Sequence, residues 1–499
     1  MRNRTTSHRR AAVLLALLAL TAGCAPTRPQ YYSGLRAGRL EAYRRWESQS
    51  QEELTRPSIE GKLNLEEAVR LSLLYSPQLQ AALEQRKVAH GRIEEAYSSV
   101  LPTVDLNANY RRLDQVTTID LGVDSFQMGA KDNYSYQVRV TQPLFKGGAV
   151  SIARRAARVY SYLSDETINA TAQSVIFQVA AAYYDTVLAE HLIGVQEAAL
   201  EFAQANLKDV EARRRHGAAR EYDVLRARVD VSNVEADLSE QRNQRDIAST
   251  RLLRAIGASQ RSSVELTTDV TYEETSPDFL DAVRTAFENR PDIYKAALSL
   301  DLQQEAVNEA YTHYWPRLEA YYWHLWAKPD PHESNVIAWG RQWQAGLSLT
   351  WPLFDGLARE GKIIQQEALL SQAAIMLSDS EEQAIQEIRN AVLQLQNAEE
   401  IVRSQKLNVD QAERALELAQ VGYREGANTQ LEVLDARAAL TRTQGLYYTA
   451  LHRHVKARLD LRRAKGILGP RAGSQELANS GYLADPQGVP PGLPENETP

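Results

Sequence analysis

The 499-residue sequence predicts an α+β protein of two internal repeats, each a β-hairpin followed by a long antiparallel α-helical hairpin. Three observations support this prediction. Short motifs recur at a fixed interval, the apolar period switches from helical to alternating within each half, and a heptad pattern then continues without proline. Fixed-interval self-similarity indicates duplication, and the apolar period indicates the type of element.

The duplication is measured by the offsets between matching motifs. Ala68-Val69 recurs as Ala282-Val283 at an offset of 214, whereas Pro143-Leu144-Phe145 recurs as Pro352-Leu353-Phe354 at 209. The five-residue difference lies between Tyr110 and Tyr134, so the two halves differ in one loop. The expected divisions are a signal peptide at 1–23, an N-terminal segment at 24–60, repeat 1 at 61–257, a linker at 258–277, repeat 2 at 278–468 and a C-terminal tail at 469–499.

Residues 1–23 have the features of a secretion signal. Four arginines precede an apolar run from Ala11 to Ala22. Twelve helical residues span about 18 Å, which is short of the ~30 Å hydrocarbon core of a bilayer. Loss of this segment changes the formal charge from −7 to −11, because it carries four arginines and no acidic residue. The acidic balance argues against a nucleic-acid partner.

Cys24 is the only cysteine, so an intramolecular disulfide is excluded. The run from Leu20 to Cys24 resembles a bacterial lipobox, although its leucine stands one place farther from the cysteine than usual. This resemblance implies lipidation of mature Cys24, with palmitate among the acyl chains, and Ala25 implies sorting to the outer membrane. The alternative is a stray cysteine in an ordinary signal peptide. No later stretch approaches eighteen apolar residues, so any membrane crossing would have to use strands.

Each half contains a predicted β-hairpin, at 103–142 and 317–351, with one apolar and one polar face. In the first strand, apolar residues from Val104 to Tyr110 alternate with polar ones. The strand from Leu318 to Trp326 is less regular, because Tyr321, Trp323 and Leu325 interrupt its polar face. Four strands cannot close a barrel around water. Either the helices cover the apolar face, or several copies of the chain combine their strands.

Long helices are predicted around these hairpins. Residues 65–100 have a helical pattern, and proline-free helices are expected from about 148 to 216 and from 357 to 424, each about 100 Å long. Their apolar residues follow an unbroken 4,3 spacing, as at Ile388, Ala391, Leu395 and Ala398, which predicts left-handed coiled-coil packing. Return helices are expected at 221–256 and 430–465.

The strand–helix junctions share the pattern Pro-Leu-Phe-x-Gly, from Pro143 to Gly147 and from Pro352 to Gly356. Proline cannot donate to a sheet ladder, so each proline is expected to end strand pairing, and each glycine allows a sharp change of direction. These junctions, the lipobox and the segment from Gly426 to Ala436 together resemble the TolC family of outer-membrane efflux and export factors, lipoprotein type. The similarity spans about residues 60–468.

The resemblance implies a homotrimer in the outer membrane of a Gram-negative bacterium. Three chains would complete a transmembrane β-barrel in outer-membrane lipid, and their helices a coiled-coil tunnel in the periplasm. The implied function is passive conduction of drugs or secreted proteins in a tripartite efflux or type I secretion system. The implied partners are a periplasmic membrane-fusion adaptor and an inner-membrane transporter. The alternative is a periplasmic coiled-coil adaptor or structural lipoprotein without a pore.

The same resemblance assigns a periplasmic gate to four residues. Glu432 and Asp435 fall on positions that form acidic rings, and Tyr423 with Asp223 on a hydrogen-bonded pair that holds the tip closed. The alternatives are a capping-box glutamate, solvated acids and a packed tyrosine. The family's latch arginine falls at Asn428, so an arginine-based lock is not expected there. No catalytic motif or metal-ligand spacing is present, so neither an enzyme nor a cofactor is predicted.

Overall fold

A computed structural model describes residues 28–48, 57–120, 125–333 and 336–469. The signal peptide, Cys24 and the tail from residue 470 lie outside these residues. The chain divides into two compact units, residues 1–59 and 60–499. In the first unit the structure describes the helix α2 (Arg28–Ser48) and residues 57–59. None of the described helices is both long and apolar enough to cross a lipid bilayer.

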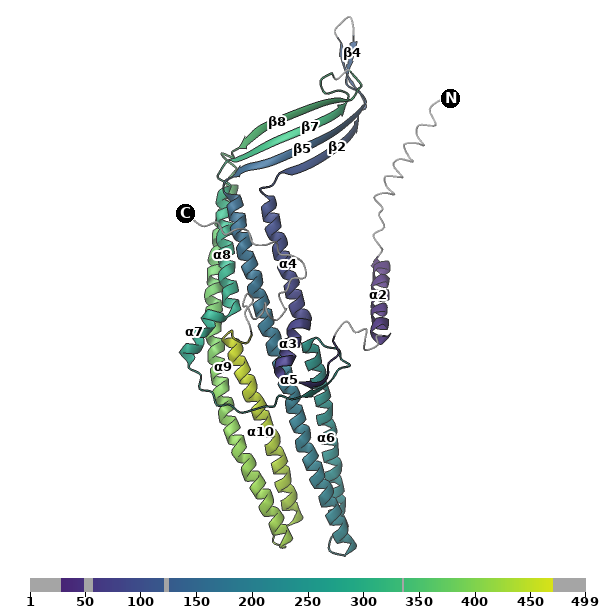
Figure 1. Ribbon diagram of the computed structural model, residues 1–499, viewed down its shortest axis with the longest axis vertical. Helices are drawn as coiled ribbons and strands as arrows, with labels where there is room; N and C mark the ends of the chain where they lie inside the picture. The colour runs from purple at the N-terminus through teal and green to yellow at the C-terminus, as the bar shows by residue number, and fades with distance from the viewer. Residues whose placement is uncertain (1–27, 49–56, 121–124, 334–335, 470–499) are drawn as a thin grey trace, which may run out of the picture. The chain divides into compact units, whose positions relative to one another are not determined.

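The second unit contains the same six elements twice (Figure 1), and a short parallel pair of strands, β1 and β6, brings together the two ends of the first set. The first set is α3 (Leu65–Tyr75), α4 (Pro77–Ser98), β2 (Thr103–Arg112), β5 (Asp132–Lys146), α5 (Ala149–Arg215) and α6 (Glu221–Ile256). The second set is α7 (Phe279–Asn289), α8 (Pro291–Thr312), β7 (Arg317–Lys328), β8 (Gly340–Thr350), α9 (Ala358–Arg424) and α10 (Gln430–Ala464). The remaining strands are β1 (Glu60–Leu63), β3 (Thr117–Asp120), β4 (Ser125–Met128) and β6 (Ser263–Leu266).

The expected single helix over 65–100 is wrong, because the structure has two helices, α3 and α4. Ser76 between them is extended, with φ −63° and ψ 122°. The ring of Pro77 disfavours helical geometry at the preceding residue, while proline itself suits the first turn of the next helix. The second repeat breaks in the same way at Arg290, before Pro291. The break therefore belongs to the repeated design.

The four long strands form one antiparallel sheet in the order β2-β5-β7-β8. Its register places Leu106 opposite Val138, Val138 opposite His324, and His324 opposite Trp343. Directly opposed residues point to the same face, so most apolar residues of the four strands share a single face, with Tyr321, Trp323 and Leu325 of β7 on the other. The shared face is open in the single chain, with Leu106 70 % exposed and Leu347 67 % exposed.

The expectation that Pro143 ends strand pairing is wrong. Pairing with β7 continues to Lys146 across a bulge between Pro143 and Phe145, because the bulge accommodates the missing N–H. Pro352 does follow the end of β8. Gly147 has φ 61°, and a Cβ there would lie 2.7 Å from the carbonyl oxygen of Thr312. Gly356 also has a positive φ, 71°, which glycine adopts without strain.

The predicted heptad residues form the core of the long helices. In α9, Ala384, Ile388, Leu395 and Ala398 are fully buried. The cluster around Ile388 also contains residues of α7 and α10, so these three helices of the second repeat share one core. Long helices gain most of their stability from such packing. The resulting rods are α5–α6 and α9–α10 hairpins with turns at 216–220 and 425–429 (Figure 1).

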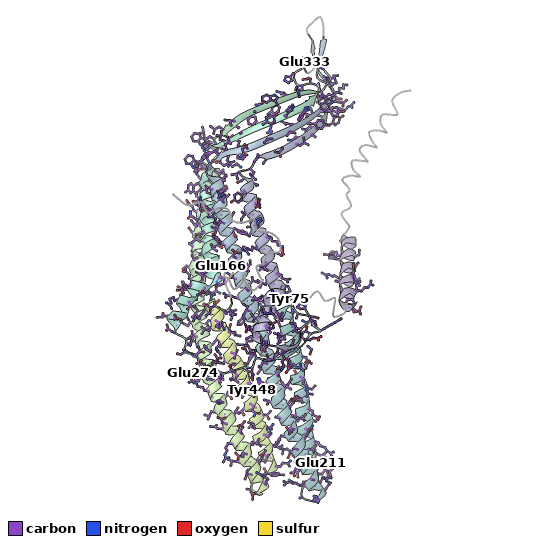
Figure 2. The ribbon with its side chains drawn as sticks, viewed as in Figure 1. Tyr75, Glu166, Glu211, Glu274, Glu333 and Tyr448 are labelled. Carbon is purple, nitrogen blue, oxygen red and sulfur yellow. The ribbon has the colours of Figure 1, made fainter. Side chains whose placement is uncertain are left out.

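The segment 267–278 joins the repeats, and we call it the strap. The fully buried Tyr183 hydroxyl of α5 donates to the carbonyl of Leu63 (3.0 Å) and accepts from the N–H of Thr268 (2.8 Å). Farther along, Glu273 pairs with Arg458 of α10, and Glu274 with Arg403 of α9. Figure 2 shows Glu274 beside the α9–α10 hairpin. The strap therefore contacts both long hairpins.

Candidate gate site at the helical hairpin tips

Both hairpin tips are closed by the same turn. Gly217 and Gly426 have φ values of 74° and 79°. The Ala218 N–H donates to the carbonyl of Arg213 (2.9 Å), and the Ala427 N–H to that of Gly422 (2.8 Å). Left-handed glycine with this bond back to the last turn is the Schellman ending of a helix. The backbone at each tip is therefore fixed by its own hydrogen bonds.

Asp223 and Glu432 occupy equivalent positions, the third residue of each return helix. The Arg220 N–H donates to Asp223 Oδ2 (3.0 Å), and the Thr429 N–H to Glu432 Oε2 (2.8 Å). The Glu432 N–H returns a bond to Thr429 Oγ1 (3.4 Å), which completes a capping box. A carboxylate there also interacts favourably with the helix dipole. The capping role considered for Glu432 is therefore present, and Asp223 shares it.

Tyr423 lies at the end of α9 against an apolar cluster of both long hairpins. The cluster contains Leu416 and Val433, with Phe202 of α5 packed on it. The Arg213 guanidinium of α5 lies 4.7 Å from the Tyr423 ring centroid, a cation–π distance. Within the described part of the single chain, Tyr423 and Asp223 share no hydrogen bond. The structure instead brings Tyr423 to the first hairpin through Arg213.

Asn428 closes the second turn locally. Its N–H donates to the carbonyl of Gly422 (3.1 Å), and its Nδ2 approaches the carbonyl of Ala419 (3.5 Å). A Cβ on Gly422 would lie 2.7 Å from the Asn428 side chain, so glycine leaves room for it. No latch arginine was expected at Asn428, and the structure gives this residue a turn-forming role.

The two tips differ in charge. Six arginines and two acidic residues lie between Arg213 and Arg228, whereas residues 422–437 hold two basic and three acidic ones. Glu211, labelled near the tip in Figure 2, pairs with Arg228 (2.8 Å). Asp435 and its repeat equivalent Arg226 are both exposed. The first tip is therefore basic and the second mildly acidic.

The contacts between the strap and the long helices were not predicted from the sequence. His454 is fully buried on α10, with its ring 5.0 Å from that of Tyr272 in the strap. The sequence feature that could have indicated these contacts is the acidic pair Glu273-Glu274 in the linker. In the structure these two residues pair with arginines of α9 and α10. Over the ranges that the structure describes, no group of three or more His, Cys, Asp or Glu residues could hold a metal ion.

Two long helical hairpins with capped tips, attached to an antiparallel sheet with one open apolar face, define a class of outer-membrane channel subunits. The model of the family "Outer membrane efflux protein" matches residues 68–258 and 282–467, one match for each repeat. The chain belongs to this family. The match covers most of the chain and confirms the resemblance deduced from the junction motifs.

Individual relatives agree with the family assignment. The chain is 23 % identical over 452 residues to the outer membrane protein TolC of Escherichia coli (strain K12), covering 87 % of this chain and 88 % of that protein. It is 22 % identical to the alkaline protease secretion protein AprF of Pseudomonas aeruginosa, covering 85 % and 87 %. The crystal structure of the Campylobacter jejuni CmeC outer membrane channel has the same fold, with a TM-score of 0.71, 18 % identity and coverage of 84 % and 89 %.

Proposed function

We propose that three copies of this chain form an outer-membrane channel of a tripartite efflux or type I secretion system. The observation that carries the proposal is the amphipathic sheet. Most of its apolar residues share one face across all four strands, and among the described residues each outer strand, β2 and β8, pairs on one side only. An open apolar face and two unpaired edges are costly for a single chain in water.

Trimerisation removes both costs. If β8 of each copy pairs with β2 of the next, twelve strands close into a barrel with no edge. The apolar face then contacts lipid, and the polar face lines a water-filled pore. The division into repeats at 61–257 and 278–468, with a linker at 258–277, supports this arrangement because each repeat supplies one β-hairpin and one helical hairpin per copy.

The helical hairpins supply the tunnel and its gate. Rods of 67 residues, α5 and α9, extend about 100 Å and reach far into the periplasm. The tips would contact a periplasmic membrane-fusion adaptor fed by an inner-membrane transporter, which supplies the energy. Glu432, Asp435, Tyr423 and Asp223 would surround the narrow end. An adaptor with no pore is disfavoured, because it has no use for two amphipathic β-hairpins.

Single-channel conductance of the purified protein in a planar bilayer tests the proposal. We expect discrete, long-lived openings, together with a trimer that migrates slowly in an unheated gel and needs detergent for extraction. A freely soluble monomer with no conductance would contradict both the trimer and the pore. Transport assays with a drug and with a secreted protein then distinguish efflux from secretion.

Lipid anchoring is proposed at Cys24, on the lipobox resemblance. We expect labelled palmitate to be incorporated into the wild-type protein and lost in Cys24→Ser. Because Cys24 is the only cysteine, no other thiol can account for the label. Equal labelling of the two proteins would refute anchoring at this residue while leaving the channel proposal intact.

A further inference from the structure

Three large apolar side chains of β7 lie on the otherwise polar face of the sheet. Tyr321, Trp323 and Leu325 alternate along β7, and the register places Trp323 between Arg139 of β5 and Gln344 of β8. This row contains Asp105 of β2 as well. It lies opposite the apolar face that holds Tyr322, His324 and Trp326. We call Tyr321, Trp323 and Leu325 the aromatic band.

Polar residues flank the aromatic band on both sides. On β5 the same face carries Gln137, Arg139 and Thr141, and on β8 it carries Gln342 and Gln344. Arg139 lies directly opposite the acidic residue Asp105. The band is therefore an apolar strip one strand wide on an otherwise polar face, at a strand that is not at the sheet edge.

Tyr321 is held flat against the sheet. Gln344 Nε2 donates to the Tyr321 hydroxyl (2.9 Å), and Gly346 lies directly opposite Tyr321. A Cβ on Gly346 would lie 2.8 Å from the hydroxyl oxygen and 3.0 Å from Cζ, so the ring covers the glycine. An aromatic ring over a strand glycine is a known way to stabilise a sheet. That role accounts for Tyr321, but the residue opposite Trp323 is glutamine.

We propose that the aromatic band is a contact site for flat aromatic solutes passing through the pore. This inference rests on the proposed channel, because only closure of the barrel turns the polar face inward. Ring faces held in place bind other rings by stacking, and a fixed ring loses little conformational freedom on binding. A trimer carries three such bands. The substrate class is then planar aromatic compounds, which stack on Trp323 beside the fixed ring of Tyr321.

The test uses two probe cations of equal charge in a planar bilayer. N-methylquinolinium is planar and aromatic, whereas tetraethylammonium is neither. We expect quinolinium alone to lower the wild-type current and raise its noise in a saturable way. Trp323→Leu should weaken its apparent affinity roughly tenfold, the effect of losing one stacking partner. Trp326→Leu is the matched control, because the same substitution on the same strand removes a ring from the opposite face.

Each outcome separates the inference from the channel proposal. A wild-type protein that conducts but responds equally to both cations overturns the aromatic site alone. Equal effects of Trp323→Leu and Trp326→Leu overturn it as well. A wild-type protein that does not conduct overturns the channel, and the site with it. Should Trp323→Leu fail to assemble, Tyr321→Leu is tested in the same titration, and an unchanged quinolinium affinity overturns the site.

A second measurement, without probe cations, tests which face of the sheet is in contact with water. Trp323→Cys and Trp326→Cys are reacted in lipid nanodiscs with a sulfonated maleimide, which stays in water. The unsubstituted chain, with only Cys24, gives the background. Labelling of Cys at 323 and protection at 326 supports a water-facing band. The reverse pattern overturns it.

Discussion

At the residue scale, two glycines show how the duplication is built into the core. Gly257 and Gly466 end the return helices with φ values of 86° and 73°. A Cβ on Gly257 would lie 2.4 Å from the carbonyl oxygen of Tyr75, and one on Gly466 would lie 2.7 Å from the carbonyl carbon of Asn289. Both contacts are at the corner between the two short helices of a repeat. Each repeat therefore closes on itself through one glycine.

Alanine at Gly257 or Gly466 is expected to destabilise the protein more than alanine at Gly217. All three positions have positive φ, which costs about 1–2 kcal/mol for a residue with a Cβ. Only the first two add a backbone clash, because nothing lies within 4 Å of a Cβ at Gly217. The thermal midpoint of the helical circular-dichroism signal measures the difference. Equal losses at the three sites would show that the corners adjust freely.

A buried histidine predicts a pH dependence of stability. His454 is fully buried, neither ring nitrogen has a hydrogen-bond partner among the described residues, and its Nε2 is 3.8 Å from Glu399 Oε1. Burial lowers the pKa of His454 below its usual 6.5; Arg458 adds to this effect, while Glu399 and Glu273 oppose it. The unfolded chain therefore takes up this proton at a higher pH than the folded chain.

Stability should accordingly fall as the pH drops below about 6.5 and continue to fall until the pH reaches the lowered pKa. His454→Phe keeps a ring without a titrating group and should remove this part of the pH dependence. His90→Phe, at an exposed position on α4, serves as the control. Thermal midpoints at about pH 8 and about pH 5 give the comparison. An acid-induced loss that is the same in His454→Phe and wild type would assign the effect to other groups.

At the element scale, the periodic elements could be predicted from the sequence, whereas the places where a single residue overrides the pattern could not. The 4,3 spacing in α9 predicted its buried side, because helix geometry places residues at this spacing on one side of the helix. The break before Pro77 was missed because the apolar pattern continues through it. The bulge at Pro143 was missed because it depends on pairing with β7, more than 170 residues away along the chain. Leu357 adopts φ 70° where the first repeat has Gly148, which no periodicity reveals.

The hairpin tips allow a test between two roles for Tyr423. If its hydroxyl holds the gate, Tyr423→Phe should raise channel conductance. If its ring holds the two hairpins together through Arg213 at 4.7 Å, Tyr423→Phe should leave conductance unchanged. Tyr423→Leu and Arg213→Gln should then each raise it, since either change removes a contact worth about 0.5–1 kcal/mol. Single-channel recording distinguishes these results, and an increase in Tyr423→Phe alone would favour the hydroxyl.

At the scale of the whole molecule, function requires properties that one chain lacks. The sequence indicated that four strands cannot close a barrel, and it therefore pointed to several copies. It could not reveal that the four strands place most of their apolar residues on one common face, because that depends on the register between distant strands. Nor could it separate capping from gating at Glu432, since the same carboxylate can do both. The exposed charges at Asp435 and Arg226 have no capping role and are better reporters of the gate.

These two equivalent positions give opposite predictions for ion selectivity. In a trimer, three copies of Asp435 and three of Arg226 would lie around one narrow opening and partly cancel. Asp435→Asn should therefore shift the reversal potential in a salt gradient toward anions, and Arg226→Gln toward cations, because a single sign of charge then remains to attract counter-ions. Both shifts should shrink at high salt, where screening shortens the range of the charges to a few ångströms.

Asp114, between the β2 and β3 strands, provides a control that is distant in the sequence from both tips, and Asp114→Asn should leave selectivity unchanged. If the two tip variants shift the potential in the same direction, or neither does, these residues do not line the opening.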